Sequence, residues 1–286
     1  MTEVPNIRQA LLTGKHRLAN LGDQAAHECL ILLQNVTQKT KVKLLAFDEE
    51  LLEVEQYQRF IQLLERRAAG EPSAYIIEEK EFWSLPLKVT ADVLIPRSDT
   101  ELLVETALAV LANKQQANIL DLGTGSGCIA LALASELPQA QITACDRSPA
   151  CLNIAQQNAK NLGLENISWH ESDWFSTLSV KPYDLIVSNP PYIAADDPDL
   201  ASNVAEYEPT YALIAQDQGL ADLNKIIQQA GDYLLEAGHL ILEHGWQQAG
   251  QVQNALRQQG FSAIETRTDL QGHERVSMAQ YSSHVR

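Results

Sequence analysis

The stretch with the clearest chemistry is Asn189-Pro190-Pro191-Tyr192, which follows an apolar run from Tyr183 to Ser188. Proline fixes φ, lacks an N–H and holds the residue before it in extended geometry. The Asn189 side-chain oxygen and the Pro190 carbonyl can therefore converge as two acceptors on one planar NH2 group. Tyr192 can lie against the flat face of whatever carries that group. On its own, such a stretch is more often a proline-rich turn after a buried strand. Other residues are therefore needed to distinguish a binding site from a turn.

A second candidate site is the loop that contains Gly123, Gly125 and Gly127, which follows the apolar segment 118–122. Without a Cβ, these residues let the backbone turn sharply and approach a ligand closely. Asp146 lies 19 residues beyond Gly127 at the end of the next apolar segment, where it can accept hydrogen bonds from both ribose hydroxyls of an adenosine. The sequence therefore predicts a nucleoside-containing cofactor.

The acidic residue Asp121, just before this loop, helps to choose the cofactor. The glycine spacing is G-x-G-x-G and differs from the G-x-G-x-x-G of dinucleotide sites. A carboxylate repels a pyrophosphate but attracts a sulfonium or an amino group. These features favour S-adenosyl-L-methionine over NAD, so an NAD-dependent dehydrogenase is the weaker alternative. Asp173 and Trp174 are predicted to cover the adenine, with Asp173 accepting from its amino group and Trp174 packing on the ring.

The charge of the chain is uneven and argues against a nucleic-acid substrate. Residues 1–80 hold 10 Lys/Arg and 12 Asp/Glu, which leaves 11 and 25 of the totals of 21 and 37 for the rest. A duplex-binding enzyme normally presents a basic face to phosphates. An acidic carboxyl-terminal part therefore favours a different substrate.

Composition narrows the class of protein further. The 286 residues are 45% hydrophobic, and no apolar run approaches the ~20 residues of a membrane span. No secretory signal is visible at the N-terminus, so a cytoplasmic protein is expected. The cysteines have neither C-x-x-C pairing nor ligand-like His spacing, which predicts reduced thiols, no disulfide and no metal (Cys29, Cys128, Cys145, Cys151).

Periodicity divides the chain into three parts. Residues 1–72 show helical spacing and predict a small helical bundle that binds a partner or covers a site. Residues 73–96 are expected to form a hairpin or extended connector. The third part begins at residue 97, and from residue 117 strands alternate with helices. This pattern predicts an α/β fold: a seven-stranded, mostly parallel Rossmann-like sheet with helices on both faces and an antiparallel hairpin at one edge. Ligands of such sheets bind at the carboxyl ends of the strands, where both candidate loops lie.

Taken together, these motifs resemble the class I S-adenosylmethionine-dependent methyltransferases that act on planar amino groups. The resemblance rests on Asp121-Leu122-Gly123-Thr124-Gly125-Ser126-Gly127, Asp146, Asp173-Trp174-Phe175 and Asn189-Pro190-Pro191-Tyr192. More narrowly, the chain resembles the bacterial release factor N(5)-glutamine methyltransferases. That similarity is carried by Gly70-Glu71-Pro72, Glu81-Phe82-Trp83, Pro96-Arg97-Ser98-Asp99-Thr100-Glu101 and Glu243-His244-Gly245.

The resemblance implies methylation of the glutamine in the Gly-Gly-Gln loop of class-1 peptide chain release factors, by a monomer that needs no metal and binds no nucleic acid directly. It implies that cofactor contacts come from Asp121, Gly123, Thr124, Gly125, Ser126, Gly127, Asp146, Asp173, Trp174 and Asn189. Asn189, Pro190 and Tyr192 would be the catalytic residues, and these with Pro191 would hold the substrate amide.

Several alternatives stay open at the level of sequence. An adenine-amino DNA or RNA methyltransferase would present the same planar NH2 group, and a non-catalytic cofactor-binding interaction protein is a second possibility. Arg97 could contact ligand or form a structural ion pair, and the acidic stretch 196–199 could be a solvated loop or clasp a basic partner. Glu243 and His244 are interpreted as structural support at a strand end. Ser98 and the segment 76–78 depart from the family pattern, which predicts a different local geometry there.

Overall fold

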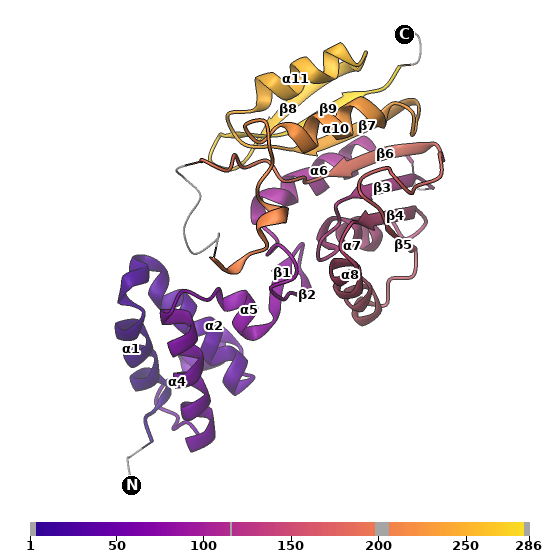
Figure 1. The fold of residues 1–286 in the computed structure, drawn as a ribbon. Helices are drawn as coiled ribbons and strands as arrows, with labels where there is room; N and C mark the ends of the chain where they lie inside the picture. The colour runs from indigo at the N-terminus through magenta and orange to yellow at the C-terminus, as the bar shows by residue number, and fades with distance from the viewer. Residues whose placement is uncertain (1–3, 115, 198–205, 283–286) are drawn as a thin grey trace. The chain divides into compact units, whose positions relative to one another are not determined.

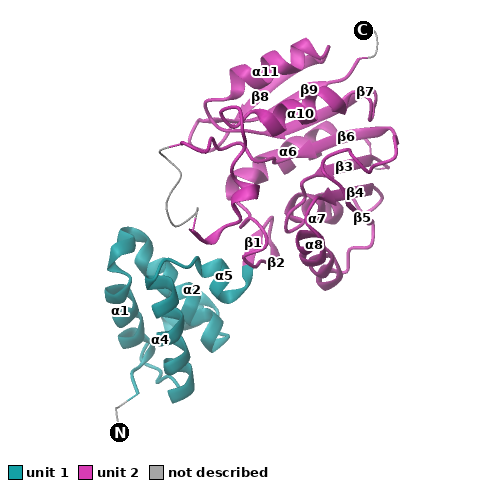
Figure 2. Ribbon diagram, in the orientation of Figure 1, with its two compact units in different colours: residues 1–79 teal, residues 80–286 magenta. Residues whose placement is uncertain are grey.

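The computed structural model describes residues 4–114, 116–197 and 206–282. The chain divides into two compact units, residues 1–79 and 80–286 (Figure 2). Each unit has its own hydrophobic core.

The first unit is helical, as its periodicity predicts. Its elements are α1 (Ile7–Arg17), the 3₁₀ segment η1 (Ala19–Gln24), α2 (Ala25–Thr37), α3 (Lys41–Ala46), α4 (Val54–Ala68) and α5 (Ser73–Ile77). Asn6 begins α1 through a reciprocal capping box with Gln9. α1 and α2 pack tightly at Gly14, where an added Cβ would lie 2.8 Å from Cys29 Sγ. Close helix packing therefore requires glycine at this position.

The connector differs from the extended chain that the sequence suggested. Residues 73–77 form helix α5, and the segment 93–95 is not a strand. The hairpin itself is shorter, with β1 (Glu79–Phe82) and β2 (Leu85–Lys88). Trp83 and Ser84 form its turn with φ of 53° and 58°, as a two-residue hairpin turn requires. Short apolar runs are ambiguous between helix and strand, which explains the wrong interpretation of residues 73–77.

The second unit is built on a seven-stranded sheet with the order β5-β4-β3-β6-β7-β9-β8 (Figure 1). Its strands are β3 (Asn118–Leu122), β4 (Gln141–Asp146), β5 (Ile167–Glu171), β6 (Tyr183–Ser188), β7 (Leu234–Glu243), β8 (Ser262–Thr268) and β9 (Glu274–Gln280). The first five of these strands run parallel, and β9 is antiparallel to both β7 and β8. The predicted fold class is confirmed, including the antiparallel edge.

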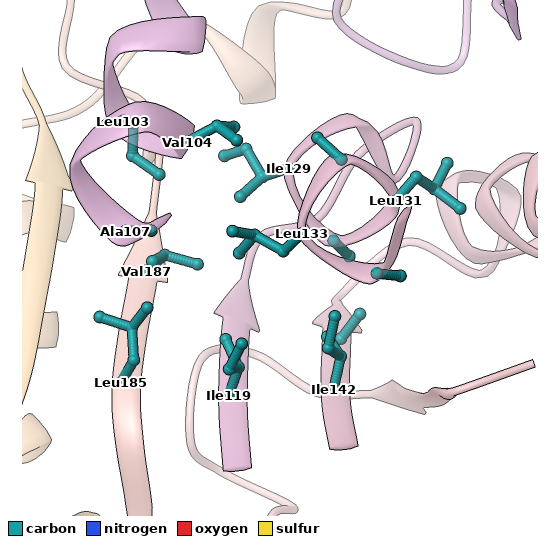
Figure 3. Packing of buried hydrophobic residues seen from close by; sticks show 14 of the residues in the cluster. Leu103, Val104, Ala107, Ile119, Ile129, Leu131, Leu133, Ile142, Leu185 and Val187 are labelled. Atoms are coloured by element: carbon teal, nitrogen blue, oxygen red, sulfur yellow. The ribbon is translucent and has the colours of Figure 1, made fainter. Parts of the chain in front are cut away.

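Helices cover both faces of this sheet. Their bounds are α6 (Glu101–Val110), α7 (Cys128–Glu136), α8 (Pro149–Leu162), α10 (Ala221–Ala230) and α11 (Ala249–Gln258). Alternate strand residues serve the two faces: Ile119 joins the core under α6 and α7, whereas Leu120 joins the core under α10 and α11. Figure 3 shows the first of these cores, with Leu103 and Ile129 packed over Ile119 and Leu185. Burial on both faces explains the mostly apolar sequences of the central strands β3, β4 and β6.

The direction in which strands are added to the sheet reverses next to β3. The chain progresses from β3 outward through β4 to β5, and then crosses back to add β6 on the other side of β3. Loops that leave β3 and β6 at their carboxyl ends therefore diverge, and a crevice forms between them.

Candidate active site

Both predicted motifs leave the sheet at this switch point. Leu122 at the end of β3 pairs in register with Ser188 at the end of β6. The Ser188 hydroxyl donates to the Leu122 carbonyl at 2.7 Å and ties the two strand ends together. The glycine loop 123–127 and the segment 189–192 thus begin side by side.

The glycine loop is shaped by left-handed backbone and by Asp146. Gly125 has φ +56° and no atom within 4 Å of an added Cβ, so its open side faces free space. Its N–H donates to Asp146 Oδ2 at 3.0 Å, and the Ser148 N–H donates to Oδ1 at 2.9 Å. Burial raises the pKa of Asp146, and the two N–H donors oppose that rise. Asp146 therefore holds the loop and still lines the pocket beside it.

Asp121 lies deeper, at the end of β3, and is fully buried. The Thr124 hydroxyl donates to its Oδ2 at 2.6 Å, while Oδ1 finds no hydrogen-bond partner among the described residues. Burial raises the pKa of Asp121 to about 7, against the lowering effect of the Thr124 hydrogen bond. An unsatisfied buried carboxylate oxygen is costly, and the raised pKa of Asp121 reflects that cost because protonation removes the buried charge.

Asp173 and Trp174 also line the pocket. The Trp174 ring covers Gly123, where an added Cβ would lie 3.1 Å from Cζ3, and its Nε1 donates to Asp222 Oδ1 at 3.1 Å. Asp173 pairs with Lys225 at 2.9 Å, with 53% and 43% of the two side chains exposed. Such a pair contributes at most about 1 kcal/mol, so Asp173 can exchange Lys225 for another donor at small cost. Its contact with adenine stays a prediction.

Asn189 and Pro191 line the same pocket, and Pro190 is buried. The Asn189 Nδ2 donates to Thr100 Oγ1 at 3.1 Å, so the amide oxygen points away from Thr100. Tyr192 is not among the described residues that line the pocket. Its hydroxyl donates instead to Glu243 Oε1 at 3.1 Å. Its predicted role as a flat surface for the substrate stays untested.

Several residues of the site carry no sequence signal that singled them out. Tyr211 lines the pocket, with its hydroxyl donating to the Asp92 carbonyl at 2.7 Å and the Arg147 guanidinium 5.2 Å from its ring centroid. Asn158 is 1% exposed, donates to the carbonyls of Lys88 and Ser126, and accepts from Lys88 N–H at 2.7 Å. Asn158 therefore joins the hairpin to the glycine loop. It lies on the buried face of α8, and its place next to Gln156 and Gln157 in the sequence concealed it.

Two residues that the sequence left ambiguous have defined partners. Arg97 forms an ion pair with Glu208 at 2.6 Å, and Glu208, with a side chain 2% exposed, also accepts from the Ile95 N–H. His244 is buried and bonds the Ser277 hydroxyl and the Gly245 carbonyl, each at 2.9 Å. Burial lowers the pKa of His244, which suits a structural role. Of the acidic stretch 196–199, Asp199 lies outside the described residues.

The lining of the pocket suits S-adenosylmethionine in its chemistry. Asp146 and Asp173 supply carboxylates to its lining, Gly125 leaves its backbone open, and the aromatic rings of Trp174 and Tyr211 supply flat apolar surfaces. In the described part of the chain no group of His, Cys, Asp or Glu side chains could hold a metal ion.

Comparison with known sequences identifies the family. Residues 98–206 match the methyltransferase small domain, and residues 9–77 match the PrmC N-terminal domain. The release factor glutamine methyltransferase of Escherichia coli (strain K12) is 49% identical over 251 residues, covering 88% of this chain and 90% of the relative. The Vibrio cholerae enzyme of the same name is 44% identical over 281 residues and 97% of each chain. The chain belongs to the release factor glutamine methyltransferase family.

Solved structures agree on the fold of this family member. The catalytic domain of hMettl16 in complex with MAT2A 3′UTR hairpin 6 has a TM-score of 0.56 at 17% identity, covering 83% of this chain and 86% of that one. A methyltransferase from Pyrococcus furiosus has a TM-score of 0.52 at 15% identity, covering 79% and 98%. At such identities the likeness concerns the methyltransferase-like fold alone. Among the described helices of the family member, none is both long and apolar enough to cross a membrane.

Proposed function

We propose that this chain transfers a methyl group from S-adenosylmethionine to the side-chain amide nitrogen of the glutamine in the Gly-Gly-Gln motif of class-1 peptide chain release factors. Such a reaction belongs to the EC 2.1.1 class and supports translation termination. The orientation of Asn189 is the observation that supports this function most directly. Asn189 lines the pocket, its NH2 group donates to Thr100, and its side-chain oxygen is turned away from Thr100. Family membership then selects a glutamine amide over an adenine amino group.

The cofactor side of the proposed site consists of the glycine loop with the carboxylates around it. We infer that Asp146 receives the ribose hydroxyls, and that Asp121 and the loop 123–127 hold the methionine part. Thr124 and Ser126 belong to this loop; Thr124 already orients Asp121, whereas Ser126 Oγ has no partner among the described residues. Trp174 and Asp173 would cover the adenine. When bound, S-adenosylmethionine supplies an electrophilic methyl group on a sulfonium.

The acceptor side must activate a poor nucleophile, because the lone pair of an amide nitrogen is delocalised into its carbonyl. The Asn189 side-chain oxygen and the Pro190 carbonyl would each accept one hydrogen of the substrate NH2 and fix the nitrogen in line with the methyl group. As positive charge develops on that nitrogen, these two acceptors bind it more strongly than the ground state. Pro191 and Tyr192 would keep this segment rigid. The released proton leaves to water.

The helical unit offers a surface suited to a protein substrate. A groove in it is lined by apolar residues together with basic and acidic ones, among them Leu12, Leu45, Lys15 and Asp23. Leu12 and Leu45 are 63% and 54% exposed, and exposed apolar groups of this kind mark interaction sites. We propose that residues 1–72 form the substrate-binding domain and 97–286 the methyltransferase domain, joined by the connector 73–96. A cytoplasmic monomer is the form expected to meet release factors.

Mass spectrometry of a release factor tests this function directly. The purified release factor is incubated with S-adenosylmethionine, with and without this protein, and the Gly-Gly-Gln peptide is examined. The expected result is a gain of one methyl group on the glutamine that depends on this protein. A parallel reaction with duplex DNA and labelled cofactor tests the adenine alternative. Label in DNA and none in the release factor would reverse the assignment.

A further inference from the structure

Buried polar side chains lie between Asn189 and a carboxyl group at the end of β7. Asn189 Nδ2 donates to Thr100 Oγ1 at 3.1 Å, and the Thr100 side chain lies close enough to the Glu243 carboxyl to lower its pKa. The Tyr192 hydroxyl donates to Glu243 Oε1 at 3.1 Å. Thr100 and Glu243 are 2% and 1% exposed, so water does not compete for these bonds. Three segments distant in sequence thus meet behind the acceptor residue.

The charge of Glu243 determines the direction of the hydrogen bonds that Thr100, Tyr192 and Asn189 make around it. An ionised carboxylate can only accept, so Thr100 and Tyr192 each direct their single proton toward it. The Thr100 oxygen is then left as an acceptor alone. Asn189 must turn its NH2 toward Thr100, because its own oxygen would meet only lone pairs there. The Asn189 oxygen therefore faces the opposite side.

We propose that Glu243 is a positioning residue, which acts through Thr100 to keep the oxygen of Asn189, and not its NH2, turned toward the substrate amide. The inference rests on the proposed function, since it assumes that the acceptor is a planar NH2 group. An Asn189 amide turned by 180° would present two donors to a group that itself only donates. The reacting nitrogen would then lose one of its two anchors.

The surroundings of Glu243 raise the pKa of its carboxyl group toward neutral pH. Burial raises the pKa of Glu243 to about 7, opposed by Thr100, Tyr192 and the nearby Arg275. Asp99 raises it further, and the charge of Glu243 in turn raises the pKa of Cys128. Its Oε2 finds no hydrogen-bond partner among the described residues.

Protonation of Glu243 removes the constraint on Asn189. A neutral carboxyl can donate to Thr100, which frees the Thr100 proton to bond the Asn189 oxygen and hold the amide the wrong way round. The rate constant kcat should therefore fall as pH drops below about 7. Asp121 also has a pKa raised to about 7, so only a comparison with a Glu243 variant isolates this part of the profile.

The test measures release factor methylation by wild type and by Glu243→Gln, Thr100→Val and Thr100→Ser. Glu265→Gln makes the same change at an exposed position of edge strand β8 and serves as the matched control. Direct removal of one transition-state hydrogen bond costs about 10²–10³-fold, so loss of its positioning group should lower kcat by about 10- to 100-fold. KM for the release factor and cofactor affinity should stay within about threefold, because ground-state binding keeps its other contacts.

The Tm of the Glu243 variant distinguishes a positioning role of this residue from a merely structural one. Gln is cheaper to bury than a carboxylate, so Glu243→Gln should fold with an undiminished Tm and yet lose kcat and the acid limb of its pH profile. Thr100→Ser should recover the activity that Thr100→Val loses.

Two results would overturn the inference while leaving the proposed function intact: Glu243→Gln with wild-type kcat, or a kcat loss that only follows a loss of folded protein. Wild type inactive on the release factor would overturn the proposed function and this inference together.

Discussion

The two sides of the site are built in different ways. On the cofactor side, comprising Asp121, the loop 123–127 and Asp146, backbone N–H groups of the glycine loop and of Ser148 hold the carboxylate of Asp146. On the acceptor side, comprising Thr100, Asn189, Tyr192 and Glu243, side chains hold one another across 89 and 51 residues of sequence. One side is a local loop with fixed backbone donors, and the other is a network assembled by the tertiary fold.

This difference has a functional consequence. Backbone donors keep their direction whatever the pH, so the cofactor side is organised mainly by glycine conformation. The acceptor side depends on where protons lie between hydroxyl, amide and carboxyl groups, and in a buried network of that kind each hydrogen bond affects its neighbours. We therefore expect cofactor-side changes to alter binding and acceptor-side changes to alter kcat.

The largest effect is expected from Asn189→Ala on the acceptor side. It removes the oxygen proposed to bind the substrate NH2 and should lower kcat by at least about 10²–10³-fold. Cofactor affinity, measured by calorimetry, should stay within about tenfold, or about 1.4 kcal/mol. Asn254→Ala, at an exposed position of α11, is the matched control. Near-wild-type turnover by Asn189→Ala would mean that the acceptor site lies elsewhere.

The same division explains what the sequence could predict. Strand and helix alternation, the glycine loop and Asp146 are contiguous patterns, and the structure places them at neighbouring strand ends as expected. Asn158, Tyr211 and Glu208 could not be identified, because each acquires its role from a partner far along the chain. The partner of the Tyr192 hydroxyl is likewise distant, since it donates to Glu243. The predicted contact of Tyr192 with the substrate stays a prediction.

A cofactor-side change should show the opposite kinetic signature. Asp146→Asn keeps the shape of the side chain but loses the charge that accepts the loop N–H groups and, by our proposal, the ribose hydroxyls. Hydrogen bonds to a charged group contribute about 1.5–3 kcal/mol, so cofactor affinity should fall by about 10- to 150-fold. With saturating cofactor, kcat should recover to near the wild-type value. If kcat stayed low at saturating cofactor, Asp146 would affect turnover as well as binding. The two sides would then not differ in their kinetic effects.

Asp121 links the cofactor side to stability through its titration. Its pKa is about 7 in the folded chain against an ordinary value of 3.8, so between these values the folded state binds the extra proton. Stability from this group is therefore full at low pH and is lost as pH rises toward 7. Asp121→Asn cannot titrate, so the Tm of the variant relative to wild type should increase between about pH 5 and about pH 8. A pH-independent difference would show that Asp121 stays ionised.

The smallest effect concerns a position outside both sides. Glu78 ends α5 with φ 56°, in the left-handed region where a side chain is strained and glycine is not. Glu78→Gly should therefore stabilise the protein by about 0.5–1 kcal/mol, because relief of strain exceeds the added flexibility of the unfolded chain. Denaturant unfolding measures this, and Glu79→Gly, one residue further into β1, should instead destabilise. Both kcat and cofactor affinity of Glu78→Gly should match wild type. A change in kcat alone would mean that the connector contributes to the acceptor side. A change in cofactor affinity alone would mean that it contributes to the cofactor side.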